Sequence, residues 1–270
     1  MSIKVKEFHD VIEKIAPSIL KENYDNVGLM VGDLDQQIGN ILVAMDCTME
    51  VIEEAVEKGC NFIFTHHPLL FIKPATITTE TLKGKKILKL IKNDIVLYSA
   101  HTNLDVVYNG INDYAAKIIG YDSIEIMDKS KINGFQKHSG IGRILELKEE
   151  MLLKDLCEKV KKIYSSETLK YSGSEEWRIK RLALINGSGQ DYFSLAKDMG
   201  VDCIITGDTT YHFVSDLVEE GVAIIDAGHF ETEWTAFKMV VNNLEKKLSD
   251  IGFNGNVIFS EVCRSPYKIL

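Results

Sequence analysis

Several features that mark other classes of protein are missing from this chain of 270 residues. The longest purely apolar runs, Ile41 to Met45 and Val222 to Ile225, are far shorter than the ~18 apolar residues of a membrane-spanning helix. The N-terminal segment carries charges throughout and lacks the apolar core of a signal peptide, so we expect a cytoplasmic protein. With 26% charged residues, 45% hydrophobic residues and only 4 prolines, the composition excludes disordered and collagen-like chains and predicts one large or two moderate globular domains.

Positive charge is also scarce. The 31 Lys and Arg residues against 40 Asp and Glu residues give a net charge of −9, and no basic run exceeds three residues. Because non-specific binding to nucleic acid depends on a basic surface, this balance argues against a nucleic-acid-binding protein.

The five cysteines form no CxxC pair, and their number is odd. Cys60, Cys203 and Cys263 lie in or beside apolar segments, which is typical of small buried side chains in a reducing compartment. We therefore expect no zinc site made of thiolates.

Apolar strands alternate with amphipathic helices along most of the chain. In the first helix, apolar residues from Val5 to Ile19 recur at spacings of three and four, and Pro17 is expected to end the helix early. Because strands that are apolar throughout are buried on both faces, the alternation predicts mainly parallel sheets covered by helices. The expected strands cover 41–46, 61–67, 95–101, 181–187, 202–208 and 222–229, and the expected helices cover 48–59, 79–94, 110–120, 190–200, 211–221 and 230–248.

A stretch in the first half of the chain can be aligned with a stretch in the second half. Residues 55–67 match residues 195–208 in order, with Gly59 on Gly200, Asn61 on Asp202 and Thr65 on Thr206. The match favours an ancient duplication of one βαβαβ unit, although any two such units share some of this pattern. We expect an α/β protein with two similar halves, residues 1–128 and 129–270, in which 129–180 is a connecting segment.

Polar side chains follow nearly every expected strand, and ligands of open α/β sheets bind beyond the carboxyl ends of strands. Four of the seven histidines fall at these ends. The residues that follow the strands in chain order are Asp46 and Thr48; His66 and His67; His101, Asn103 and Asp105; Gly187 to Gly189; Asp208; and His229, Glu231 and Glu233.

Imidazoles combined with carboxylates form a mixed donor set that suits Zn, Mn, Fe, Co or Ni. His101 and Asp105 are four residues apart, as are His229 and Glu233, so each pair can face one point. This many donors exceeds what one tetrahedral ion with an open position uses, and it suits two ions bridged by a carboxylate and water. A lone histidine at a strand end is more often a hydrogen-bonded structural residue, so the prediction depends on several strand ends sharing the pattern.

The glycine-containing segment NGSGQ (186–190) follows a strand and opens a helix, where backbone N–H groups could contact a phosphate. It lacks the Walker lysine and a complete GxGxxG pattern, so a tight turn is the simpler interpretation.

Five motifs appear in a diagnostic order: YDNVGLMVGD (24–33), FTHHPLLF (64–71), SAHTNLDVVYNGIND (99–113), TGDTTYH (206–212) and IDAGHFETE (225–233). Over residues 1–262 the chain resembles the Ngg-one-interacting-factor-three-like family of dinuclear metal proteins, whose members carry the name GTP cyclohydrolase I type 2 homolog.

The resemblance implies two α/β halves with a dinuclear metal site in the cleft between them. It implies the ligands His66, His67, Asp105, His229 and Glu233, with Glu233 as the bridging carboxylate. It places His101 nearby, as a residue that supports a ligand or contacts the substrate. It also implies a ring-shaped homohexamer, in the compact form that lacks the domain inserted in longer members.

We therefore expect a metal-dependent hydrolase that holds two divalent metal ions per chain, which can be Zn, Fe, Mn, Co or Ni. The ions would convert a bridging water into a hydroxide nucleophile, and the substrate would be a small molecule, nucleotide-like by resemblance. By position alone, His101 and Asp46 are the candidate catalytic residues for moving protons. The alternative is a non-catalytic metal-binding ring scaffold or regulatory interaction protein that uses the same ligands.

Overall fold

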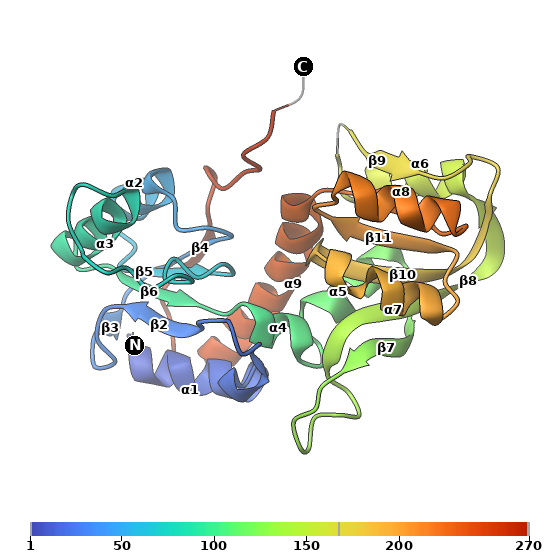
Figure 1. The fold of residues 1–270 in the computed structure, drawn as a ribbon. Coiled ribbons are helices and arrows are strands. Elements are labelled where there is room, and N and C mark those ends of the chain that lie inside the picture. The colour runs from blue at the N-terminus through green and yellow to red at the C-terminus, as the bar shows by residue number, and fades with distance from the viewer. Residues whose placement is uncertain (1, 167, 269–270) are drawn as a thin grey trace. The chain divides into compact units, whose positions relative to one another are not determined.

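A computed structural model describes residues 2–166 and 168–268 (Figure 1). The chain forms two compact units, each built from two segments: unit 1 is Met1–Val107 with Val241–Arg264, and unit 2 is Tyr108–Val240 with Ser265–Leu270. Residues 108–128, which were expected in the first half, lie in unit 2, and the end of the last helix and the last strand lie in unit 1. Among the described residues, no helix combines the length and the apolar character that crossing a membrane requires.

Unit 1 contains a five-stranded sheet of order β13-β4-β5-β6-β2, in which only β2 is antiparallel to its neighbour. On one face of the sheet, residues of α2 and α3 pack on Leu42, Ile63 and Leu97. On the other face, Phe8 of α1 packs on the aromatic rings of Phe62 and Tyr98. Burial on both faces explains why these strands are apolar at successive positions. The elements are β1 (Ile3–Lys4), α1 (Val5–Ile15), η1 (Ser18–Leu20), β2 (Gly28–Val31), β3 (Gln37–Ile38), β4 (Ile41–Ala44), α2 (Met49–Glu57), β5 (Phe62–Thr65), α3 (Leu82–Lys92), β6 (Val96–Ser99), α4 (Thr102–Val106) and β13 (Val257–Phe259).

Unit 2 contains a six-stranded mixed sheet of order β7-β8-β10-β11-β12-β9. Its centre, β10-β11-β12, is parallel as expected, while β7, β8 and β9 pair antiparallel. The segment 129–180 therefore supplies strands and a helix of this sheet domain. The elements are α5 (Ile111–Ile119), β7 (Ser123–Lys129), β8 (Gly140–Leu152), α6 (Leu153–Ile163), β9 (Lys170–Ser172), β10 (Arg178–Ser188), η2 (Gln190–Tyr192), α7 (Phe193–Asp198), β11 (Cys203–Gly207), α8 (Tyr211–Glu219), β12 (Ala223–Asp226) and α9 (His229–Asp250), whose last residues belong to unit 1.

The two units share the local structure that their matching sequences predict. Gly59 after α2 and Gly200 after α7 both adopt the left-handed conformation, with φ of +63° and +71°. Each is followed by a polar side chain that fixes the start of the next strand: Asn61 accepts a hydrogen bond from Gly39 N, and Asp202 accepts one from Arg181 N. Each glycine thus ends its helix, and the polar residue after it ties that strand to a preceding segment.

Candidate metal centre

In unit 1, the adjacent histidines His66 and His67 lie just beyond the end of β5. The backbone N–H of His67 donates to the carbonyl of Met45 over 2.9 Å, which keeps this segment beside the end of β4. The strand itself ends at Thr65, so the two side chains are not forced to opposite faces. Their ring centroids are 5.1 Å apart, and His66 is fully buried.

The next strand, β6, delivers His101 to the same place. His101 precedes α4, and the backbone N–H of Asp105 donates to its carbonyl over 3.1 Å. The ring centroid of His101 lies 5.1 Å from that of His66 and 5.6 Å from that of His67. One ligand atom from each of the three imidazoles lies within 4.8 Å of those of the other two, and Asp105 Oδ1 lies 3.7 Å from His66 Nε2. We call these four residues the unit 1 cluster.

In unit 2, His229 and Glu233 lie one turn apart at the start of α9. The Nε2 atom of His229 is 3.0 Å from Oε2 of Glu233, as their four-residue spacing predicts. Asp208, which follows β11, lies on the other side of the same imidazole, with Oδ2 2.7 Å from Nδ1. We call His229, Glu233 and Asp208 the unit 2 cluster.

Two glycines make room for the unit 2 cluster. A Cβ atom on Gly207 would lie 2.6 Å from the backbone N and Cα of His229. A Cβ atom on Gly187, whose φ is +60°, would lie 2.0 Å from Oε1 of Glu233. The NGSGQ segment thus packs its first glycine beside a candidate ligand, which gives that glycine a role other than the phosphate contact that the sequence suggested.

All four clustered histidines have the same hydrogen-bonding arrangement. Nδ1 of each faces an oxygen that can only accept: the carbonyl of Ala100 for His66, Asp46 for His67, Asp25 for His101 and Asp208 for His229, at 2.7–2.9 Å. Such an acceptor favours the tautomer with the hydrogen on Nδ1 and the lone pair on Nε2. Both nitrogens of His229 face carboxylates, because Oε2 of Glu233 lies 3.0 Å from its Nε2. Imidazoles that bind metal through Nε2 are oriented by such Nδ1 contacts, so the donor set of both clusters fits a divalent transition-metal ion.

The structure also places the two residues expected to be catalytic. Asp46 follows β4, is largely exposed and accepts the Nδ1 hydrogen of His67, so its contact orients that imidazole. His101 lies within the unit 1 cluster, and its Nδ1 is held by Asp25. These positions are compatible with proton transfer by His101 and with a positioning role for Asp46.

Asp25 is the buried residue of this site that sequence reasoning missed. Its carboxylate accepts hydrogen bonds from His101 Nδ1, Thr102 N and Thr102 Oγ1. Burial alone would raise the pKa of Asp25, but these bonds outweigh it and hold the pKa well below the ordinary value of 3.8. Asp25 belongs to the YDN motif, but 76 residues separate it from His101, so no local pattern connects the two.

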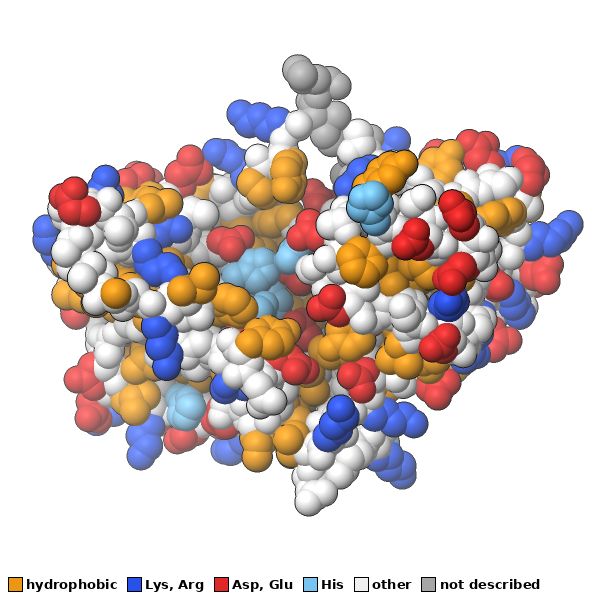
Figure 2. Space-filling model, in the orientation of Figure 1, with side chains coloured by type: hydrophobic (Ala, Val, Ile, Leu, Met, Phe, Trp, Pro, Cys, Tyr) orange, Lys and Arg blue, Asp and Glu red, His pale blue; other side chains and the backbone are white. Residues whose placement is uncertain are grey.

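The surface in Figure 2 agrees with the composition. On the face shown, Lys and Arg side chains are scattered among Asp and Glu side chains. That face therefore presents no continuous basic stripe of the kind that follows a nucleic-acid backbone.

Comparisons with known proteins extend over nearly the whole chain. A family model described as Duf34/NIF3 (NGG1p interacting factor 3) matches residues 3–266. The chain is 52% identical over 268 residues to a Clostridium acetobutylicum protein named GTP cyclohydrolase 1 type 2 homolog, with 99% of each chain covered. It is similar to the crystal structure of a Staphylococcus aureus protein, with a TM-score of 0.90, 30% identity and all of both chains covered. A Bacillus cereus protein related to NIF3 shares the fold, with a TM-score of 0.91, 24% identity and 99% of each chain covered.

Proposed function

The chain belongs to the Duf34/NIF3 family, and from this premise we propose that it is a metal-dependent hydrolase with two divalent metal ions per chain. The observation that carries the proposal is the common arrangement of the four imidazoles: Nδ1 of each faces a hydrogen-bond acceptor at 2.7–2.9 Å, the contact that orients metal-binding imidazoles.

We assign His66, His67 and Asp105 of unit 1 and His229 and Glu233 of unit 2 as the ligands. Three neutral imidazoles and two carboxylates match first-row transition ions and Zn better than Ca or Mg. The buried carboxylate of Glu233 would hold metal in this assignment, as the family resemblance implies. The choice among Zn, Fe, Mn, Co and Ni is left to measurement, because this set accepts each of them.

Divalent ions held by such a set would supply Lewis acidity and would lower the pKa of a coordinated water to near 7. The residues of the chain then have separate tasks. Asp46 and Asp208 fix the orientation of His67 and His229. His101, fixed by Asp25, presents Nε2 as a group that can accept a proton from water or return it to a leaving group.

The substrate is a small molecule with a hydrolysable carbonyl, C=N or phosphoryl group. Relatives of the chain carry the name GTP cyclohydrolase 1 type 2 homolog, so nucleotides are the first class to assay. We further propose that the protein assembles as a homohexameric ring, which light scattering of the purified protein would test.

The decisive experiment is elemental analysis of protein purified without chelator and without a nickel column. We expect about two ions per chain in the wild type, by the dinuclear assignment, and fewer in Asp105→Ala and Glu233→Gln. His212→Ala, at the exposed start of α8, is the matched control and should keep the full content. Absence of metal after incubation with Zn, Mn and Fe would overturn the proposal.

Turnover is tested separately with a panel of nucleotides, cyclic imides and esters in the presence of each metal. Any hydrolysis that belongs to this site must be lost in Glu233→Gln. Bound metal without turnover of any compound would favour a non-catalytic metal-binding scaffold.

A further inference from the structure

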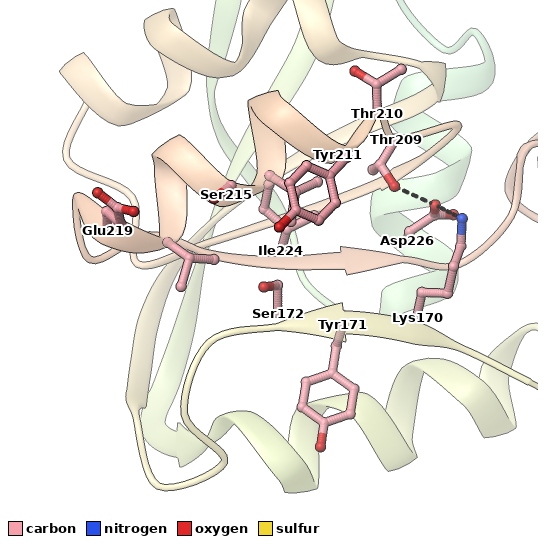
Figure 3. A pocket seen from close by; sticks show the side chains of 12 residues that line it. Lys170, Tyr171, Ser172, Thr209, Thr210, Tyr211, Ser215, Glu219, Ile224 and Asp226 are labelled. Carbon is pink, nitrogen blue, oxygen red and sulfur yellow. Dashed lines mark hydrogen bonds and ion pairs between the residues drawn. The ribbon is translucent and has the colours of Figure 1, made fainter.

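A cavity of about 540 Å³ opens in unit 2, between α8 and the edge strand β9 (Figure 3). The register pairs Ser172 with Ile224 and Lys170 with Asp226, so these four side chains lie on one face of the sheet. None of the residues that line the cavity is a proposed metal ligand. Its size is within the range of small-molecule sites.

One long side of the cavity is apolar and aromatic. Ile224 forms part of the floor, and Val214 and Val218 of α8 form part of the wall. Tyr211, on the first turn of α8, is 80% exposed and borders the same space. A ligand with a flat ring can stack on the exposed ring of Tyr211 and contact the apolar side chains beside it.

One end of the cavity is polar. The buried carboxylate of Asp226 accepts hydrogen bonds from Thr209 Oγ1 over 2.7 Å and from Gly228 N over 3.2 Å, and it lies 2.5 Å from Nζ of Lys170. The ammonium group of Lys170, whose side chain is 74% exposed, pairs with this carboxylate and keeps further N–H groups for a ligand.

Two threonine hydroxyls of the lining present acceptor oxygens. Thr209 donates to Asp226 and Thr210 donates to Gln190, so both hydroxyl oxygens offer lone pairs. Glu219 adds a carboxylate at the far end of α8, beyond Ser215. One ammonium and two carboxylates give the lining a net charge of −1, counted over Lys170, Asp226 and Glu219.

We propose that this cavity binds an uncharged nucleoside, with the base packed on Tyr211 and the ribose hydroxyls at the Lys170–Asp226 end. A nucleoside fits this lining. Its flat base can pack on Tyr211, its ribose O–H groups can donate to the acceptor oxygens, and the exocyclic amino group of adenosine can donate a hydrogen bond to Glu219. A phosphate group only accepts hydrogen bonds at neutral pH and carries negative charge, so the same lining disfavours nucleotides. This site does not depend on the proposed metal centre.

Calorimetric titration of chelator-treated protein with adenosine tests the proposal. Tyr211→Ala should weaken adenosine binding at least ~5-fold, because base stacking on an aromatic ring contributes that much or more. Phe213→Ala is the matched control, since Phe213 is also an exposed aromatic residue of α8 but does not line the cavity, and it should bind as the wild type does. Ser172→Leu, which fills the floor, should abolish binding.

Adenosine monophosphate and ribose complete the design. We expect the monophosphate to bind more weakly than adenosine, with a smaller difference in Glu219→Gln, and ribose alone to bind more weakly still. No binding of adenosine at about 1 mM, a scale at which even weak sites fill, would overturn the proposal. Equal affinity in Tyr211→Ala, or tighter binding of the monophosphate, would overturn it as well.

Discussion

Gly187 lies so close to Glu233 that a Cβ atom at residue 187 would be 2.0 Å from Oε1 of the glutamate. The glycine also adopts a φ of +60°, which disfavours any other residue. A side chain at this position must displace the carboxylate, and the carboxylate is 3.0 Å from Nε2 of His229. The geometry of the candidate ligands His229 and Glu233 thus depends on residue 187 of β10 having no side chain.

Gly187→Ala should therefore weaken metal binding by at least about 10-fold, because it displaces a proposed ligand and loss of a mere supporting contact already costs that much. Gly59→Ala is a matched control, because Gly59 has a φ of +63° and nothing within 4 Å of its Cβ position. Both substitutions should destabilise the protein by about 1–2 kcal/mol through backbone strain. Competition titration with a chromophoric chelator measures the affinities, and a similar loss in both variants would contradict this explanation.

The carboxylates behind the imidazoles should matter nearly as much as the ligands. Asp46→Asn and Asp208→Asn remove the charge that orients His67 and His229, and each should lower metal affinity by about 10- to 100-fold. Glu245→Gln, on an exposed position of α9, is the control for a lost surface charge. If the three variants bind metal equally well, the Nδ1 contacts do not tune a metal site.

Local patterns predicted much of this structure. The three-and-four spacing from Val5 onward marks α1, and strands apolar at every position mark the parallel centres of both sheets. His66 and His67 were identifiable because position at a strand end is itself a local property. The expected helix over 190–200 divides into η2 and α7, a difference of the size that helix termini commonly show.

Contacts between distant segments could not be predicted. β13 (Val257–Phe259) is three residues long, and only its pairing with β4 makes it a strand. The same limit hid Asp25, whose partners His101 and Thr102 lie more than 70 residues away. A polar residue in a loop gives no sequence signal that it will be buried against an imidazole.

The buried contacts of Asp25 predict a stability that depends on pH. Because the pKa of Asp25 is lowered in the folded protein, its ionised form stabilises the fold at pH values above 3.8, and this contribution is lost as the pH falls below that value. In chelator-treated protein, Asp25→Asn should reduce the free energy of unfolding by about 1.5–3 kcal/mol at pH 7, the range for hydrogen bonds to charged groups.

The difference between wild type and Asp25→Asn should shrink steadily as acid titrates the carboxylate, which calorimetric melting at several pH values would show. Asp10→Asn, at an exposed position of α1, should leave stability nearly unchanged at every pH. A difference that stays constant from pH 7 to pH 3 would rule out Asp25 ionisation as its source.

In unit 2, we expect the largest loss of folding stability from replacing the fully buried Arg143. Arg143 of β8 donates from Nε to Asp113 over 2.5 Å and from Nη1 to the carbonyls of Gly140 and Gly142. Removing one partner of a buried ion pair leaves the other charge without compensation, so Arg143→Met should destabilise the protein by about 3–5 kcal/mol. The double variant Arg143→Met/Asp113→Leu should recover most of this loss, because no charge is then left in the core.

Arg178 provides the comparison at the surface, since its pair with Glu150 is exposed and spans 3.4 Å. Arg178→Met should cost no more than about 1 kcal/mol. Both tryptophans of the sequence, Trp177 and Trp234, belong to unit 2, so urea unfolding followed by tryptophan fluorescence reports on this unit. If the double variant is less stable than Arg143→Met, the arginine acts through its packing and its carbonyl contacts, and the charge of Asp113 is not the source of the loss.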